Sequence, residues 1–241
     1  MSTQSENQQA VAQSLPSIQA VSFDLDDTLW DCASAINKAE EVLYAWHEEF
    51  TPEITVQHTP DTLLEYRARV RAKHPELAGC VTAMRLAGLK SLLSDFGYSV
   101  ALAEQAFEVF YKARSEVVLY DGVVDMLGTL KQRYKLAAIT NGNADLEQIG
   151  IARYFDAVYA ADLTLQQKPH ADMFERCLSH FRLSAAQMLH IGDNPVTDIG
   201  GGHNASVQTL WFNPYNEPWP EHLAPPHYQV QQLSQIVQLL A

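Results

Sequence analysis

The sequence contains few cysteines, and their number and spacing exclude several kinds of site. Three of the 241 residues are cysteine, namely Cys32, Cys80 and Cys177. An odd number of widely separated cysteines without a CxxC pair argues against a disulfide framework. The same spacing gives no support for a zinc or iron–sulfur centre. We therefore expect buried or neutral thiols in a reducing compartment.

Basic residues are also scarce. The chain has 16 lysines and arginines against 29 aspartates and glutamates, which gives a formal net charge of −13. We therefore expect no nucleic-acid partner bound through a basic face, and no binding to an acidic membrane surface.

Long apolar runs are missing as well. No stretch reaches the roughly 18 consecutive apolar residues that a membrane span needs. Residues 1–16 have neither the basic start nor the apolar segment of a secretory signal. We expect a flexible tail over residues 1–17, no membrane partner and a cytoplasmic location.

The apolar residues that are present form short runs typical of buried strands. At 47% hydrophobic and 19% charged residues, the chain can bury a large core. Strand-like runs alternate with longer helical patterns, which favours the α/β class with a Rossmann-like parallel sheet. Five prolines between Asn213 and Tyr228 predict a loop, and Val230–Leu240 then predicts a closing helix. The predicted strands are Ile18–Phe23, Lys135–Thr140, Phe155–Ala160, Met188–Asp193 and Val207–Phe212.

A helical block interrupts this pattern after the first strand. Apolar residues from Ile36 to Phe50 recur at spacings of three and four, as one face of a helix requires. Similar patterns follow near Leu63, Met84 and Phe107, and no convincing strand lies between them. We therefore expect a discontinuous core formed by residues 18–31 and 119–241, with an inserted helical domain over residues 32–118.

Acidic residues follow the first predicted strand directly. Asp24, Asp26 and Asp27 come after a buried apolar run, where carboxylates are costly unless a cation or hydrogen bonds compensate them. In an open parallel sheet, ligands bind at the carboxyl ends of the strands. The competing interpretation is a helix N-cap with an acidic first turn.

Three further groups of polar residues follow later strands. Thr140-Asn141-Gly142 ends the second strand, and Lys168-Pro169 follows the third; these could also be an ordinary strand–loop junction and a solvated lysine. Asp193 ends the fourth strand, and Asp198 follows it. Acidic groups at two strand ends favour a hard cation with oxygen ligands, and Mg²⁺ fits because it needs few carboxylates.

The four groups, in this order, resemble the four motifs of the haloacid dehalogenase (HAD) superfamily in its phosphatase branch. The correspondence runs from residue 18 to about residue 212, and the helical insertion is similar to the C1-type cap of that family. The resemblance implies a HAD fold and a magnesium-dependent phosphomonoester hydrolase that acts on a small-molecule phosphate ester.

The resemblance also implies a role for each motif residue. Asp24 would be the nucleophile that forms an aspartyl-phosphate, and Asp26 the general acid and base. Mg²⁺ would be held by Asp24, by the backbone carbonyl of Asp26 and by Asp193. Thr140 and Asn141 would bind the phosphoryl group, and Lys168 would neutralise charge and orient the nucleophile. Asp198 would position Lys168 or a metal-bound water.

The same comparison separates branches of the superfamily. Dehalogenases lack an acid two residues after the nucleophile, because a halide leaves without a proton, whereas this chain has Asp26 there. A phosphomutase or phosphotransferase would keep both acids, and a regulatory domain that accepts phosphate without turnover is a further alternative. The sequence leaves the oligomeric state open.

Substrate identity depends on the inserted helices. Longer phrases (Phe23–Asp31, Ala138–Ala144, Lys168–Phe174 and His190–Asp193) are similar to bacterial flavin-pathway phosphatases. That similarity implies 5-amino-6-(5-phospho-D-ribitylamino)uracil or flavin mononucleotide (FMN) as substrate. Tyr44, Trp46, Arg85 and Tyr111 are candidate lining residues, although packing or surface roles also explain them. The basic run Arg67, Arg69, Arg71 and Lys73 predicts a solvated helix face.

Overall fold

Parallel strands form one six-stranded sheet in the order β3-β2-β1-β4-β5-β6. The computed structural model describes residues 17–240, so the predicted tail lies almost wholly outside the described residues. All pairings are parallel, which confirms the predicted α/β class with a Rossmann-like sheet. The strands are β1 (Ala20–Phe23), β2 (Lys135–Thr140), β3 (Ala157–Ala160), β4 (Met188–Gly192), β5 (Gln208–Phe212) and β6 (Tyr228–Val230).

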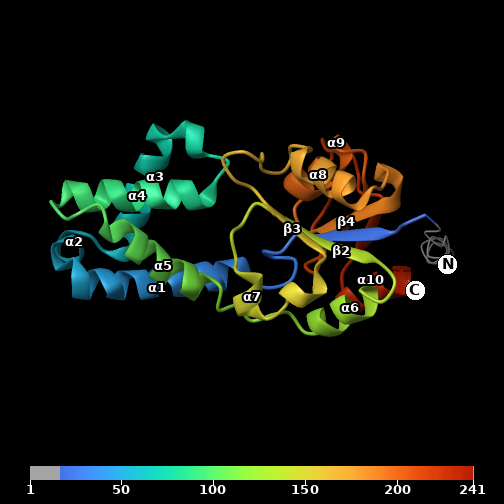
Figure 1. The fold of residues 1–241 in the computed structure, drawn as a ribbon, viewed down its shortest axis with the longest axis horizontal. Coiled ribbons are helices and arrows are strands. Elements are labelled where there is room, and N and C mark those ends of the chain that lie inside the picture. The colour runs from blue at the N-terminus through green and yellow to red at the C-terminus, as the bar shows by residue number, and fades with distance from the viewer. Residues whose placement is uncertain (1–16, 241) are drawn as a thin grey trace, which may run out of the picture.

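Both faces of the sheet are covered by helices, and the strand sequences are apolar on both sides for that reason (Figure 1). Val21 and Phe23 pack in the cluster that includes α6 (Val123–Leu130) and α10 (Leu233–Leu240). Ala137 and Ile139 face the opposite cluster, with α8 (Asp172–Phe181). Alternate side chains of these strands thus point to opposite faces of the sheet and pack in two separate apolar clusters.

The structure differs from the sequence expectations at the connections. The connection from β2 to β3, where the alternating pattern predicts a helix, contains only the single turn α7 (Leu146–Ile149) and a short 3-10 helix, Ala152–Tyr154. Gly150 ends the turn in the left-handed region at φ 86°, which stops the helix. The predicted loop before Tyr228 ends in β6, which was missed because three residues are too few to show alternation.

The inserted helices form a separate block beside the sheet (Figure 1). Its helices are α1 (Cys32–Phe50), α2 (Pro52–Gln57), α3 (Pro60–Lys73), α4 (Val81–Asp95) and α5 (Leu102–Arg114), with a 3-10 helix at Pro75–Leu77. Asp31 caps α1, and its side chain accepts from the Ser34 amide. Leu43, Leu93 and Phe110 belong to an apolar cluster that draws all its buried members from this block.

Two chain segments connect the block to the sheet, and Trp30 joins them. Trp30 is fully buried and makes single strand-like bridges to Asp26 and Leu119. The Tyr120 amide donates to the Leu29 carbonyl 2.9 Å away. The entering and leaving segments are therefore held side by side, close to the carboxyl end of β1.

Two expectations from composition can be compared with the described residues. Cys32, Cys80 and Cys177 are free, and burial raises the pKa of Cys32 and Cys177 to about 12, so both thiols are neutral at ordinary pH. Within residues 17–240, no helix is both long enough and apolar enough to cross a membrane.

Helix α9 (Gly200–Asn204) packs so closely on β5 that Gly202 has no room for a side chain. A Cβ atom there would lie 2.4 Å from Cγ2 of the buried Thr209. We predict that Gly202→Ala lowers the free energy of unfolding by about 1–3 kcal/mol through overpacking. Chemical denaturation measures this loss.

The control is Gly88→Ala in the interior of α4, where an added Cβ meets no atom within 4 Å. Because alanine favours a helix over glycine, this variant should gain about 0.5–1 kcal/mol. Equal effects of the two substitutions would contradict the proposed packing constraint.

Candidate active site

The carboxyl ends of three adjacent strands bring the predicted residues together. Asp24 follows β1, Thr140 ends β2 and Asp193 follows β4, and β1 lies between the other two strands. The Asp24 amide donates to the Ile191 carbonyl at 2.8 Å, which continues the β1–β4 pairing up to the acidic residue.

Lys168 lies at the centre of the buried charges. Its Nζ donates to Asp24 Oδ1 and to Asp198 Oδ1, both at 2.6 Å, and the Lys168 side chain is 1% exposed. Burial alone would lower the pKa of Lys168, but the two carboxylates outweigh it and raise the pKa above its usual value. Lys168 therefore carries a full positive charge and holds both acids in place.

The pKa values of the two acids that contact Lys168 are shifted in opposite directions. Burial raises the pKa of Asp24 well above its usual value, and Lys168 offsets only part of that effect. Asp198 is also fully buried, yet Lys168 and His190 outweigh the burial and hold its pKa well below the usual range. The Asn194 amide donates to Asp198 Oδ2 at 2.9 Å. Lys168, His190 and Asn194 therefore all hold this carboxylate in place.

Asp193 completes an acidic group that suits a cation. Carboxylate oxygens of Asp24, Asp193 and Asp198 lie within 4.8 Å of one another. Burial raises the pKa of Asp193 to about 7, with Asp198 adding to the shift, while Thr28 Oγ1 donates to its Oδ1 at 3.0 Å. Three carboxylates against the one ammonium of Lys168 leave a formal charge of −2, and such an all-oxygen donor set fits a divalent cation.

Thr140 and Asn141 shape the loop after β2. Thr140 is buried, and its Oγ1 accepts from the Gly142 amide at 2.9 Å. The Asn141 side chain binds the Lys168 backbone twice, through Oδ1 to the amide at 2.7 Å and Nδ2 to the carbonyl at 3.0 Å. The Asn141 side chain therefore positions Lys168 and is not directed at a ligand.

Asp26 is held by a residue that the sequence analysis missed. Its Oδ2 accepts from Arg114 Nη2 at 2.6 Å, and its Oδ1 accepts from Trp30 Nε1 at 2.9 Å. Arg114, at the end of α5, is 2% exposed and also donates from Nε to Asn143 Oδ1 at 3.1 Å. No local signal marks this arginine, because 88 residues separate it from Asp26.

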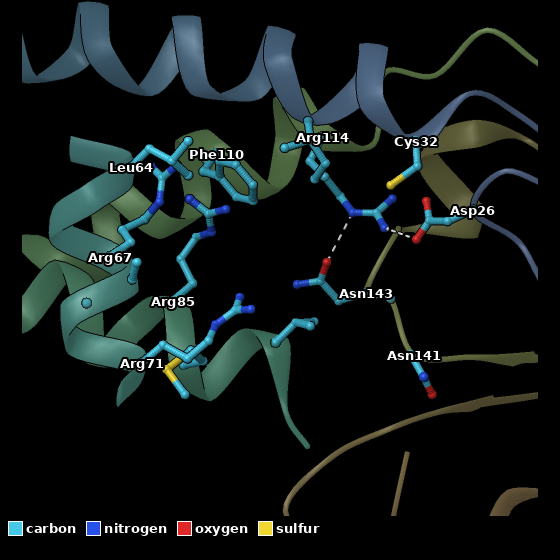
Figure 2. A pocket seen from close by; sticks show the side chains of 16 residues that line it. Asp26, Cys32, Leu64, Arg67, Arg71, Arg85, Phe110, Arg114, Asn141 and Asn143 are labelled. Atoms are coloured by element: carbon cyan, nitrogen blue, oxygen red, sulfur yellow. Dashed lines mark hydrogen bonds and ion pairs between the residues drawn. The ribbon is translucent and has the colours of Figure 1, made fainter. Parts of the chain in front are cut away.

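A cavity of about 550 Å³ opens beside Asp26, between the sheet edge and the inserted helices (Figure 2). This volume is in the range of small-molecule sites. Arg67, Arg71 and Arg85 reach into it from the helical side, facing Arg114 and Asn143 (Figure 2). The other lining residues are Cys32, Ile36, Leu64, Ala68, Val81, Met84, Gly88, Phe110, Asn141 and Gly142.

The four residues that the sequence analysis gave as candidates for lining the substrate site lie in different surroundings. Arg85 lines the cavity and also packs, with its guanidinium carbon 3.5 Å from the Phe110 ring centroid. Trp46 is buried and stacks on Phe50, whereas Tyr111 stacks on Phe107 and does not line the cavity. Tyr44 lines a second, smaller cavity of about 220 Å³ within the helical block.

The expectation that the basic run is a solvated face was wrong for Arg67. Its Nη1 pairs with Glu40 Oε2 at 2.6 Å, and its side chain is 29% exposed, because α1 supplies Glu40 opposite α3. Arg71 is exposed but faces the cavity, and Arg69 points its guanidinium over the Tyr66 ring instead.

The four groups of motif residues all lie in a segment that matches a known protein family. The sequence model of the haloacid dehalogenase-like hydrolase family matches residues 18–206, which is most of the chain. This chain belongs to that hydrolase family. It is therefore an enzyme, as its motifs predict, and the HAD fold of the sheet is confirmed.

Several curated relatives match almost the whole chain. The 5-amino-6-(5-phospho-D-ribitylamino)uracil phosphatase YigB of Escherichia coli is 31% identical, over 92% of this chain and 96% of its own length. The human N-acylneuraminate-9-phosphatase is 27% identical, over 94% of this chain and 95% of its own length. These relatives bear out the predicted resemblance to HAD phosphatases.

Solved structures agree on the fold. A structure described as a 2-haloacid dehalogenase from Pseudomonas syringae has a TM-score of 0.85 and 35% identity, covering 92% of this chain and 98% of that chain. The HAD-hydrolase YfnB of Bacillus subtilis, solved with magnesium, has a TM-score of 0.66 and 25% identity, covering 92% and 98%.

Lys168 is the cation on which two buried acids depend. We predict that Lys168→Met lowers the free energy of unfolding by about 3–5 kcal/mol, because Asp24 and Asp198 lose their shared partner. Denaturant unfolding in the presence of a chelator measures the loss without a contribution from bound metal.

Lys90→Met is the matched control. Lys90 pairs with Glu104 at 3.0 Å on the surface, where the two side chains are 47% and 61% exposed. Removal of such a pair should cost less than about 1 kcal/mol. A Lys168→Met protein as stable as the control would contradict the central role of this ammonium.

Proposed function

We propose that this chain is a magnesium-dependent phosphomonoester hydrolase that acts on a small phosphorylated metabolite through an aspartyl-phosphate. The observation that carries the proposal is the contact of Lys168 with Asp24 and Asp198, beside Asp193, at adjacent strand ends. A carboxylate nucleophile, a fixed cation and an acidic donor set are the groups that phosphoryl transfer needs.

In the first step, a carboxylate oxygen of Asp24 attacks phosphorus. The bond from phosphorus to the ester oxygen breaks, and Asp26 gives its proton to that oxygen, so the leaving group departs as an alcohol. In the second step Asp26 takes a proton from a water molecule, whose oxygen attacks phosphorus. The bond from phosphorus to the Asp24 oxygen then breaks, which releases inorganic phosphate and restores the Asp24 carboxylate.

Neighbouring residues prepare these steps. Lys168 would neutralise charge on the transferring phosphoryl group and keep Asp24 oriented, since its Nζ is 2.6 Å from Asp24 Oδ1. Asp198 would position Lys168 from the opposite side. The Thr140 hydroxyl and the Asn141 backbone amide would donate to the phosphoryl oxygens at the end of β2.

Asp24 and Asp193, with the backbone carbonyl of Asp26, would hold the Mg²⁺ ion. The formal charge of −2 around Lys168 supports a divalent ion, and oxygen donors favour Mg²⁺. When bound, the ion supplies positive charge that reduces the repulsion between a carboxylate nucleophile and a phosphate dianion.

We further propose a flavin-pathway phosphate as the substrate. The support is the similarity to YigB along 92% of this chain, together with a cavity of about 550 Å³ next to Asp26. The candidate substrates are 5-amino-6-(5-phospho-D-ribitylamino)uracil and FMN.

Dehalogenation is the second candidate, because the Pseudomonas syringae structure at 35% identity is described as a 2-haloacid dehalogenase. Asp26 supports the phosphatase alternative, since a halide leaves without a proton and would have no use for an acid held by Arg114 and Trp30. Release of halide from a 2-haloacid, with no release of phosphate from esters, would favour dehalogenation.

We predict that Asp24→Asn reduces phosphate release from p-nitrophenyl phosphate by more than about 10³-fold, because the nucleophile is lost. Removal of metal with a chelator should abolish the wild-type activity, and Mg²⁺ should restore it. The surface variant Asp125→Asn serves as the control and should keep full activity.

Other outcomes of that assay would point elsewhere. An Asp24→Asn protein with undiminished turnover would overturn the assigned nucleophile. A single burst of phosphate without repeated turnover would favour a phosphate-accepting regulatory domain. Preferred transfer to a sugar rather than to water would favour a phosphotransferase or a phosphomutase.

Arg114 is expected to act through Asp26, which it contacts at 2.6 Å. We predict that Arg114→Gln lowers kcat about 10–100-fold on an alkyl phosphate, because Asp26 loses its orientation. The loss on p-nitrophenyl phosphate should be much smaller, since that leaving group needs little help from an acid.

Two further variants test this positioning role. Lys112→Gln, on the same helix but exposed, should leave both rates unchanged. In an Asp26→Asn background, Arg114→Gln should add little further loss, because the two residues act as a unit. Equal losses on both substrates would show a general structural role instead.

A further inference from the structure

Three arginines of the inserted helices line the large cavity, and two of them share a single carboxylate. Arg67 Nη1 lies 2.6 Å from Glu40 Oε2, and Arg85 Nη1 lies 2.9 Å from Glu40 Oε1. Within residues 17–240, no carboxylate lies within ion-pair distance of Arg71. One acid against three guanidinium groups leaves a formal surplus of two positive charges, in a chain whose net charge is −13.

The position of Glu40 leaves this surplus facing the large cavity. Arg67, Arg71 and Arg85 line the cavity of about 550 Å³ and Glu40 does not; Glu40 lines the smaller cavity, together with Arg67 and Arg85. The 2.9 Å contact of Arg85 is not aligned as a hydrogen bond, so Arg85 Nη1 and Glu40 Oε1 are buried atoms without one. The guanidinium that remains available to a ligand is that of Arg71, which is exposed and lines the large cavity.

Arg85 is held rigidly enough to recognise a ligand. Its guanidinium lies over the Phe110 ring at 3.5 Å, and its side chain is 17% exposed. Burial lowers the pKa of Arg85, and the nearby charges of Arg67 and Arg71 add to that shift, while Glu40 opposes it. Because Glu40 compensates only one of the three charges, the surplus beside the cavity is unfavourable unless an electronegative group enters it.

The same cavity reaches the catalytic edge of the sheet. Asp26 and Arg114 line its opposite side, and Arg114 is already paired with Asp26 at 2.6 Å (Figure 2). A substrate whose ester oxygen lies near Asp26 would therefore extend its leaving group toward α3 and α4, which carry the three arginines of the cavity wall.

We propose that Arg67, Arg71 and Arg85 form a subsite for an electronegative oxygen group at the end of the leaving group remote from phosphate. This inference rests on the proposed phosphatase function and narrows its substrate class. Two sources share the chemistry: a carboxylate, which guanidinium groups bind with matched charge, and the 2,4-dione edge of a pyrimidine or flavin ring, which offers carbonyl acceptors.

The test compares Arg71→Gln with the wild-type enzyme on four phosphate esters. FMN carries the dione edge, 6-phosphogluconate carries a carboxylate, and sorbitol 6-phosphate and phenyl phosphate carry neither. Arg71 is chosen because it is exposed and has no acidic partner among the described residues, so its loss leaves the helix packing intact. We expect KM to rise about 10-fold or more on FMN, on 6-phosphogluconate or on both, as for one charge-assisted hydrogen bond.

The controls separate recognition from structure. Arg69→Gln changes an exposed arginine of the same helix that does not line the cavity, and it should alter none of the four reactions. Arg71→Lys keeps the charge and should recover part of the lost affinity for a carboxylate. On phenyl phosphate and sorbitol 6-phosphate, Arg71→Gln should leave kcat and KM unchanged.

The outcomes distinguish this subsite from the proposed function itself. A selective loss on FMN assigns the dione, and a selective loss on 6-phosphogluconate assigns the carboxylate. Equal effects on all four esters, or none on any, would overturn the subsite. So would a wild-type enzyme that does not hydrolyse FMN and treats 6-phosphogluconate and sorbitol 6-phosphate alike. Failure to hydrolyse p-nitrophenyl phosphate with Mg²⁺ would instead reject the phosphatase proposal.

Discussion

The buried ammonium of Lys168 is the contact on which the rest of the site depends. Parallel strands place Asp24 and Asp193 side by side, because β1 and β4 are neighbours, and Asp198 follows one turn later. Such a concentration of carboxylates in a buried place is unfavourable without a cation. Lys168 supplies one at 2.6 Å from two of the acids, and Asn141 fixes its backbone.

A second cation comes from outside the sheet. Asp26 is paired with Arg114, at the end of α5, whereas Lys168 pairs with Asp24 and Asp198. The acids at the sheet edge are thus divided between a lysine of the core and an arginine of the inserted helices. Any displacement of α5 relative to the sheet changes the surroundings of Asp26 directly, whereas Asp24 keeps its partner. The proposed acid is therefore the group most sensitive to the position of the helical block.

Sequence patterns could predict the sheet and the motif residues, but not the contacts between distant segments. Buried strands such as β2 are visible in the sequence as continuous apolar runs. The order of Asp24, Thr140, Lys168 and Asp193 along the chain indicates the candidate site. Arg114 could not be predicted, since its pairing depends on how α5 meets a loop 88 residues earlier. Arg67 was misassigned for a related reason: a basic helix face is solvated only if no other helix offers an acid, and α1 offers Glu40.

Net charge is a poor guide to the ligand of this chain because the sign of the local charge differs between the sheet edge and the helical side of the cavity. The sheet edge has a surplus of carboxylates around Lys168, which favours a divalent cation and, through it, a phosphate. The helical end has a surplus of guanidinium groups around Glu40. The helices carrying those groups pack on an apolar cluster of their own. Substitutions that alter the charge at the helical end can therefore change which leaving group is accepted, while the pairing of Lys168 with Asp24 stays the same.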